Sequence, residues 1–143
     1  MISVGRLRPP YVDDVAHYTK LLGRYTRLEQ VELRDSRGGG AQSREAGGER
    51  LAGRLPRGAF VSLLAADGQQ LDSIGFARFI EARRDSAKDL VFVIGGAHGL
   101  ELPRADHRLS LGPMTLPHQL ARVVLLEALF RAHRIIAGEP YHY

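Results

Sequence analysis

The sequence contains no cysteine and no tryptophan. The absence of cysteine excludes a disulfide framework, thiolate metal sites and cysteine nucleophiles. No apolar run approaches the ~20 residues that a membrane-spanning helix requires. The first ten residues hold arginines and prolines, without the hydrophobic stretch that defines a signal peptide. We therefore expect a cytoplasmic location.

Length and composition are those of one globular domain. Of the 143 residues, 44% are hydrophobic and 25% are charged, a balance typical of neither disordered nor membrane proteins. We therefore expect a single domain over residues 1–143.

Positive charge is in modest excess and is carried almost entirely by arginine. Twenty basic residues face sixteen acidic ones, and only Lys20 and Lys88 are lysines. Guanidinium groups bind phosphates bidentately and stack on bases, which favours a nucleic-acid partner. A net charge of +4 equally fits a solvated helix surface, so charge alone leaves both interpretations open.

Apolar runs and turn residues predict alternating strands and helices. We expect strands over residues 2–5, 28–33, 59–65, 90–94 and 109–111, and helices over residues 11–23, 48–55, 72–84, 103–108 and 119–136. The glycine-rich residues 36–48 are expected to form a surface loop, and Asp67-Gly68 a turn. Nearly continuous apolar strands indicate an α/β fold with a mostly parallel sheet.

The last predicted helix, residues 119–136, is apolar around most of its circumference, with only a narrow polar stripe. A terminal helix covers a sheet with one face, so a second apolar face needs another cover. In so small a chain the favoured cover is a second copy, and we expect a homodimer.

Two segments that follow predicted strands are candidates for ligand binding, because α/β sheets bind ligands at this edge. Residues 95–99 contain three glycines, which let backbone amides approach a ligand, although their spacing differs from the dinucleotide fingerprint. Residues 111–118 are too apolar for an ordinary exposed loop and suit an adenine-like ring. Tight turns without a ligand remain the alternative for both segments.

The histidines and the chain end define the remaining candidates. Six histidines show no close ligand spacing such as H-x-x-x-H, so we expect no metal. No G-x-S-x-G elbow indicates a hydrolase nucleophile. The tail that ends in Tyr141, His142 and Tyr143 is either a frayed terminus or a set of groups that stack on bases.

Three segments in register carry a resemblance to a known family. They read F-V-I-G-G-A-H-G-L at residues 92–100, M-T-L-P-H-Q-L-A-R-V-V-L-L-E-A-L-F-R-A at residues 114–132 and G-E-P-Y-H at residues 138–142. The sequence resembles the ribosomal RNA large subunit methyltransferase H family, which belongs to the SPOUT methyltransferases with an α/β knot. Looser similarity continues through residues 2–7, 48–51 and 61–77, so the resemblance covers nearly the whole chain.

The resemblance implies a homodimer with a trefoil knot in its C-terminal part and S-adenosylmethionine bound by the knot region, residues 90–136. It places the cofactor contacts on Leu64, Gly95, Leu111, Gly112, Pro113, Met114, Thr115 and Leu116.

The implied activity is methylation of N3 of pseudouridine 1915 in 23S rRNA within the large ribosomal subunit. His142 is the preferred base or base-orienting residue, His118 is the second choice, and a water molecule is a further proton acceptor. Candidate rRNA contacts are Arg6, Arg8, Arg122, Arg131, Arg134 and Tyr141. The alternatives are a catalytically silent RNA- or ribosome-binding homodimer and a small nucleotide-binding protein unrelated to RNA.

Overall fold

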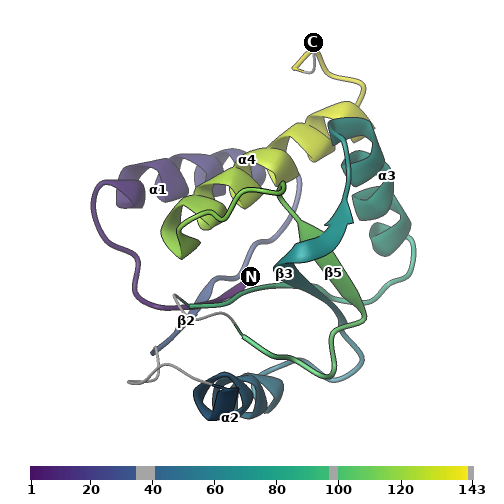
Figure 1. The fold of residues 1–143 in the computed structure, drawn as a ribbon. Coiled ribbons are helices and arrows are strands. Elements are labelled where there is room, and N and C mark those ends of the chain that lie inside the picture. The colour runs from purple at the N-terminus through teal and green to yellow at the C-terminus, as the bar shows by residue number, and fades with distance from the viewer. Residues whose placement is uncertain (35–40, 97–99, 142–143) are drawn as a thin grey trace.

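The computed structural model describes residues 1–34, 41–96 and 100–141, within which five strands form one sheet in the order β2-β1-β4-β3-β5 (Figure 1). The strands are β1 (Ile2–Val4), β2 (Val31–Leu33), β3 (Phe60–Gln70), β4 (Leu90–Ile94) and β5 (His107–Ser110). The helices are α1 (Tyr11–Leu22), α2 (Ala41–Ala52), α3 (Ser73–Arg84) and α4 (His118–Ile136). All four strand pairings are parallel in these residues, which confirms the expected α/β fold.

The sheet is covered on both faces. Helices α1, α3 and α4 lie on one face and α2 lies on the other (Figure 1). Strand β4 shows the alternation that this requires, because Phe92 and Ile94 belong to the core under α4, whereas Val91 and Val93 belong to the core under α2. All four of these side chains are buried.

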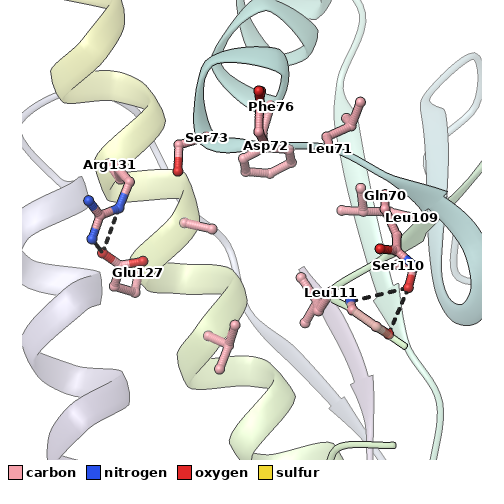
Figure 2. Close-up of a pocket in the computed structure, with 13 residues that line it drawn as sticks. Gln70, Leu71, Asp72, Ser73, Phe76, Leu109, Ser110, Leu111, Glu127 and Arg131 are labelled. Atoms are coloured by element: carbon pink, nitrogen blue, oxygen red, sulfur yellow. Dashed lines mark hydrogen bonds and ion pairs between the residues drawn. The ribbon is translucent and has the colours of Figure 1, made fainter. Parts of the chain in front are cut away.

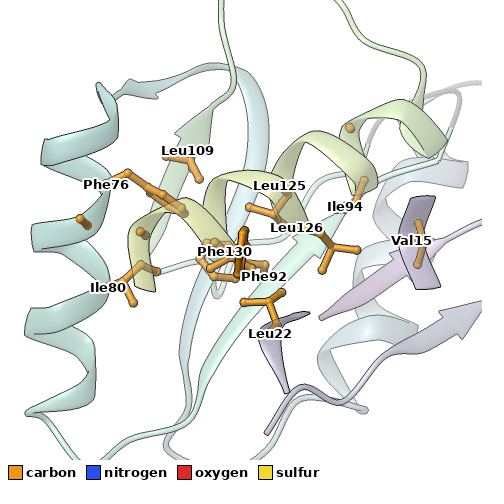
Figure 3. Packing of buried hydrophobic residues seen from close by; sticks show 14 residues of the cluster. Val15, Leu22, Phe76, Ile80, Phe92, Ile94, Leu109, Leu125, Leu126 and Phe130 are labelled. Carbon is orange, nitrogen blue, oxygen red and sulfur yellow. The ribbon is translucent and has the colours of Figure 1, made fainter. Parts of the chain in front are cut away.

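Helix α4 packs against both α1 and α3 as well as against the sheet (Figure 3). Leu125 and Leu126 are fully buried, and Phe130 contacts the rings of Tyr18 and Tyr25 from the α1 side. Helices α1 and α3 of the same chain therefore cover the sides of α4 for which the sequence predicts a second copy as the cover. The apolar circumference of α4 does not by itself require a dimer, and the homodimer and the knot stay predictions.

The expected loop over residues 36–48 is wrong in its second half, because α2 begins at Ala41 rather than Gly48. Glycine is a poor helix former, which is why the sequence pattern favoured a loop. Gly48 is used here for close packing instead: a Cβ added to it would lie 1.8 Å from the carbonyl oxygen of Glu101. Residues 35–40 lie outside the described part of the chain.

The expected turn at Asp67-Gly68 is also wrong, because β3 continues to Gln70. The register of the β3–β5 pairing shifts between Leu64 and Gln69, so that both residues pair with Leu109. Gly68 permits this bulge, since a Cβ there would lie 2.7 Å from backbone carbons of Arg108 and Leu109.

The expected helix over residues 103–108 does not form, because β5 already begins at His107. Asp106 explains the difference. Its carboxylate accepts a hydrogen bond from the backbone N–H of Val61 at 2.8 Å, and its own N–H donates to the carbonyl oxygen of Val61 at 2.9 Å. These bonds tie the segment to β3 in an extended conformation.

Candidate functional site

A cavity of about 740 Å³ opens where the central strands reach their carboxyl ends. Its wall is formed by the bulged part of β3, the segments that follow β4 and β5, and the first turn of α4. Ligand sites commonly measure roughly 300–1,000 Å³, so this cavity has room for a nucleoside-sized molecule.

The structure brings together most of the cofactor candidates named from the sequence. Those that line the cavity are Leu64, Gly95, Leu111, Gly112, Met114, Thr115 and Leu116. Pro113 is exposed and is not part of the lining. The turn after β4 and the apolar segment after β5, which the sequence singled out separately, therefore face one common space.

The segment after β5 is fixed to the β3 bulge by Ser110. The Ser110 hydroxyl shares its proton between the carbonyl oxygens of Ala66, at 3.1 Å, and Gly112, at 3.0 Å, and accepts from the N–H of Gly112 at 3.2 Å. Gly112 has φ +136°, a conformation that side-chain-bearing residues rarely adopt. Glycine at this position therefore shapes the cavity wall.

The rim of the cavity carries two ion pairs that join its walls. Arg108 contacts Asp67 at 2.6 Å, and the hydrogen bond that Arg108 donates lowers the pKa of Asp67. Arg44 of α2 lies 3.9 Å from Glu101. The four charged side chains among the described lining residues thus balance one another.

These four residues are the ones that sequence reasoning missed. Asp67 had been assigned to a turn and Arg44 to a loop, and each pair joins residues that are far apart in the chain. No local pattern indicates such pairs, because they arise from the β3 bulge and from the early start of α2.

His118, the second candidate base, is the first residue of α4 and lines the cavity. The N-terminal loop lies against it: a Cβ added to Gly5 would be 2.9 Å from His118 Nε2. The loop is held there in part by Gln119, whose side-chain oxygen accepts from the backbone N–H of Arg8 at 2.7 Å. Arg6 and Arg8, two candidate rRNA contacts, are therefore exposed beside the first turn of α4.

Arg122, another candidate rRNA contact, is buried in the structure. Its side chain is 2% exposed, forms a 2.8 Å ion pair with Glu32 and donates to the carbonyl oxygen of Gly5. Burial favours the neutral form of Glu32, but hydrogen bonds from Arg122 and the N–H of Leu7 outweigh it and lower the pKa of Glu32. Arg122 thus connects α4, β2 and the N-terminal loop, and its side chain is not exposed to an RNA partner.

Arg131 and Arg134 lie in the second half of α4 and hold the C-terminal tail. Arg131 pairs with Glu127 at 2.6 Å beside a smaller cavity of about 220 Å³ that also borders Ser110 and the start of α3 (Figure 2). Arg134 pairs with Glu139 at 2.5 Å, and Glu139 also accepts from the hydroxyl of Tyr25 at 2.7 Å.

Tyr141, the remaining tail candidate, rests on α4. Its ring contacts Phe130 edge-on and lies 4.9 Å from the Arg131 guanidinium, and its hydroxyl donates to Glu127. Burial and the nearby Glu127 carboxylate raise the pKa of Tyr141. His142 and Tyr143 lie outside the described residues, as do Ala97, His98 and Gly99.

Two structural searches bear on the class of site. In the part of the chain that the structure describes, no group of three or more His, Asp or Glu side chains is placed to hold a metal ion. No helix within the described ranges has the length and apolarity to cross a membrane.

Comparison with known proteins gives a family that spans nearly the entire chain. A family model described as "Predicted SPOUT methyltransferase" matches residues 1–142. A Pelobacter propionicus protein named ribosomal RNA large subunit methyltransferase H is 45% identical, and the match covers 100% of this chain and 97% of that protein. The chain belongs to this SPOUT methyltransferase family.

Other members of the family agree. Proteins of the same name from Gemmatimonas aurantiaca and Bifidobacterium adolescentis are each 42% identical, over 99% of this chain and 97% of each relative. The family resemblance read from three sequence segments is thus confirmed, and the aligned length leaves no large part of the chain without a counterpart.

Proposed function

We propose that this chain methylates N3 of pseudouridine 1915 in the 23S rRNA of the large ribosomal subunit, with S-adenosylmethionine as methyl donor. One observation carries the proposal: seven of the eight cofactor candidates surround a single cavity of about 740 Å³. The names of relatives that align over nearly the full chain support the rRNA substrate class. We further propose one domain, a knotted C-terminal part and a homodimer in the cytoplasm.

The chemistry of the cavity suits this cofactor. Leu64, Leu111 and Leu116 offer apolar surface for an adenine ring, and Gly112 lets backbone groups approach it. Arg44, whose Nε lies 3.9 Å from Glu101 and has no hydrogen-bond partner among the described residues, gives this wall a cation for a ligand carboxylate. When bound, the cofactor supplies an electrophilic methyl group on its sulfonium sulfur.

The proposed reaction is an in-line displacement that depends mainly on positioning. N3 of the base gives its proton to an acceptor, and the N3 electron pair forms the new N–CH₃ bond as the bond between carbon and sulfur breaks. The chain therefore has to hold two reactants in line, exclude water and accept one proton.

His142 is our preferred proton acceptor or acceptor-orienting group. It directly follows Tyr141, whose ring and hydroxyl are held by Phe130, Arg131 and Glu127. His118 is the second choice because it lines the cavity, and a water molecule remains a third. Arg6, Arg8, Arg131, Arg134 and Tyr141 stay as proposed rRNA contacts.

The deciding experiment incubates the protein with S-adenosylmethionine and large ribosomal subunits that lack this methyl group. We expect the target nucleotide to gain one methyl group by mass spectrometry, and His142→Ala to slow its appearance at least tenfold. We also expect the cofactor to raise the thermal unfolding midpoint by mass action. Unmodified RNA together with an unchanged midpoint would favour the silent RNA-binding alternative.

A matched pair of glycine variants tests the cavity itself. Gly112→Ala strains a residue at φ +136°, so we expect cofactor affinity to fall about tenfold. Gly58 also has positive φ and an open Cβ direction but lies outside the cavity, so Gly58→Ala should leave affinity within twofold. If titration calorimetry gives the two variants equal affinities for S-adenosylmethionine, this cavity is not the cofactor site.

A further inference from the structure

Another cavity, of about 530 Å³, lies at the amino-terminal edge of the sheet. Leu90 and Phe92 of β4 line it, whereas Ile94 at the other end of β4 lines the cofactor cavity. Buried apolar residues that include Leu22 and Leu129 form its floor. We call it the amino-edge hollow.

The rim of the amino-edge hollow is strongly basic. Among the described residues, it carries five basic side chains, Arg27, Arg54, Arg83, Arg84 and Lys88, and two acidic ones, Glu29 and Asp89. This excess of three positive charges contrasts with the cofactor cavity, where two basic and two acidic side chains balance. The charge imbalance at the hollow therefore approaches the net charge of the whole chain, +4.

Three of the cations at the hollow are available to a ligand. Arg54, Arg84 and Lys88 are exposed, and no acidic side chain pairs with them in the described ranges. Arg27 is paired with Glu29 at 2.9 Å, and Arg83 lies over the Phe60 ring at 4.4 Å.

The candidate rRNA contacts on α4 differ from these three cations. Arg122 is buried against Glu32, Arg131 is paired with Glu127, and Arg134 is paired with Glu139. An acidic partner within 4 Å offsets the attraction of each of these arginines for a phosphate. Compared with α4, the hollow thus carries more positive charge that has no acidic partner among the described residues.

Helix dipoles account for only part of this cluster. Arg83 and Arg84 occupy the last turn of α3, and Arg27 follows α1, where basic side chains offset the negative helix end. Each helix end carries roughly half an elementary charge, so two ends offset about one of the three excess charges. A net positive field remains over the hollow.

We propose that the amino-edge hollow binds phosphates of the rRNA substrate at a distance from the nucleotide that receives the methyl group. The inference rests on the proposed function and extends it. Helix α4 contributes Ala121 to the cofactor cavity and His133 to the hollow, and this stretch of helix is about 18 Å long. At roughly 3.4 Å per stacked nucleotide, about five nucleotides span the same distance.

The test compares two double variants that each remove two positive charges. Arg84→Gln with Lys88→Gln removes two positive charges from the hollow, whereas Arg78→Gln with Arg104→Gln removes two exposed arginines that do not line it and have no acidic partner in the described part of the chain. Equilibrium affinity for large ribosomal subunits is measured against salt concentration, with cofactor affinity and maximal methylation rate measured in parallel.

We expect the hollow variant to bind subunits at least tenfold more weakly and to lower the slope of log affinity against log salt by roughly 1.4–1.8, about 0.7–0.9 for each of the two lost phosphate contacts. Its cofactor affinity and maximal rate should stay within twofold of the parent, and the control variant should match the parent throughout. Parent-like subunit affinity in the hollow variant would overturn the inference. Loss of affinity in both variants would also overturn it, because it would show a general charge effect. Failure of the parent protein to methylate RNA would instead count against the proposed function, since affinity is measured separately.

Discussion

His107 contacts two residues of β3 through its two ring nitrogens. Its Nε2 lies 3.0 Å from the side-chain oxygen of Gln69, and its Nδ1 lies 3.0 Å from the hydroxyl oxygen of the fully buried Ser62. The imidazole thus joins β3 and β5.

The stability of the fold should depend on pH through this residue. Burial and, secondarily, the charge of Arg83 lower the pKa of His107 below 6.5. The unfolded chain therefore takes up a proton first as the pH falls, so this stabilisation is complete above pH 6.5 and is lost at lower pH. We expect the free energy of unfolding to decline from pH 7 to 5, by at most about 1.4 kcal/mol per pH unit for one proton.

The matched variants are His107→Asn and His17→Asn. Because His133 has a pKa lowered by burial in the same direction, the decline in His107→Asn should become shallower without vanishing. The exposed His17 should leave the slope of the parent protein unchanged. Urea unfolding at several pH values measures these slopes, and identical slopes in all three proteins would refute the role of His107.

Helix α2 is the element in which packing outweighs intrinsic propensity. Its buried contact with the sheet includes Leu51, which is 0% exposed, and Gly48, which lies against the backbone at Glu101. Replacing a helix-interior glycine with alanine normally stabilises a helix by about 1 kcal/mol. Here the added methyl group has no space.

We therefore expect Gly48→Ala to lower the free energy of unfolding by about 2 kcal/mol, the cost typical of an overpacked contact. Gly53→Ala, just after the same helix, meets its nearest atom at 3.7 Å and serves as the control with a change below about 0.5 kcal/mol. Chemical denaturation measures both variants. A stabilised Gly48→Ala would show that α2 is not held against Glu101.

The elements with a regular apolar pattern were predictable from the sequence, and the others were not. The buried run of β4 and the long apolar helix α4 were found within one residue of their bounds. Gly48, Gly68 and Asp106 misled the prediction because each makes a contact with a chain segment distant in sequence. The same limit applies to the site: its two loops were recognisable, but its ion pairs and the burial of Arg122 depend on tertiary structure.

Across the whole molecule, Arg122 connects segments from opposite ends of the chain. Its partner Glu32 is 41% exposed, so solvent screens part of this pair. Removing Glu32 would leave the guanidinium buried without its carboxylate, which is the costly way to break such a pair.

We expect Glu32→Ala to lower the free energy of unfolding by about 2 kcal/mol, and Arg122→Met added to it to recover part of that loss. Glu29→Ala, which removes a pair between two largely exposed side chains, should change it by less than about 0.5 kcal/mol. Thermal and urea unfolding of the parent, the single variants Glu32→Ala and Arg122→Met and the double variant form the double-mutant cycle, with Glu29→Ala measured as the control. A double variant less stable than Glu32→Ala would mean that Arg122 is stabilising without its partner.

Helix α4 runs from the cavity of about 740 Å³ to the amino-edge hollow without a break. One residue inserted between Ala121 and Leu129 would rotate the far half of this rod by about 100° and advance it by about 1.5 Å. Phe130 and His133 would turn out of the core, and Glu139 of the tail would lose its hydrogen bond from the hydroxyl of Tyr25. We therefore expect the protein to tolerate insertions and deletions in its connecting segments but not within α4. The length of α4 between the two cavities should be fixed.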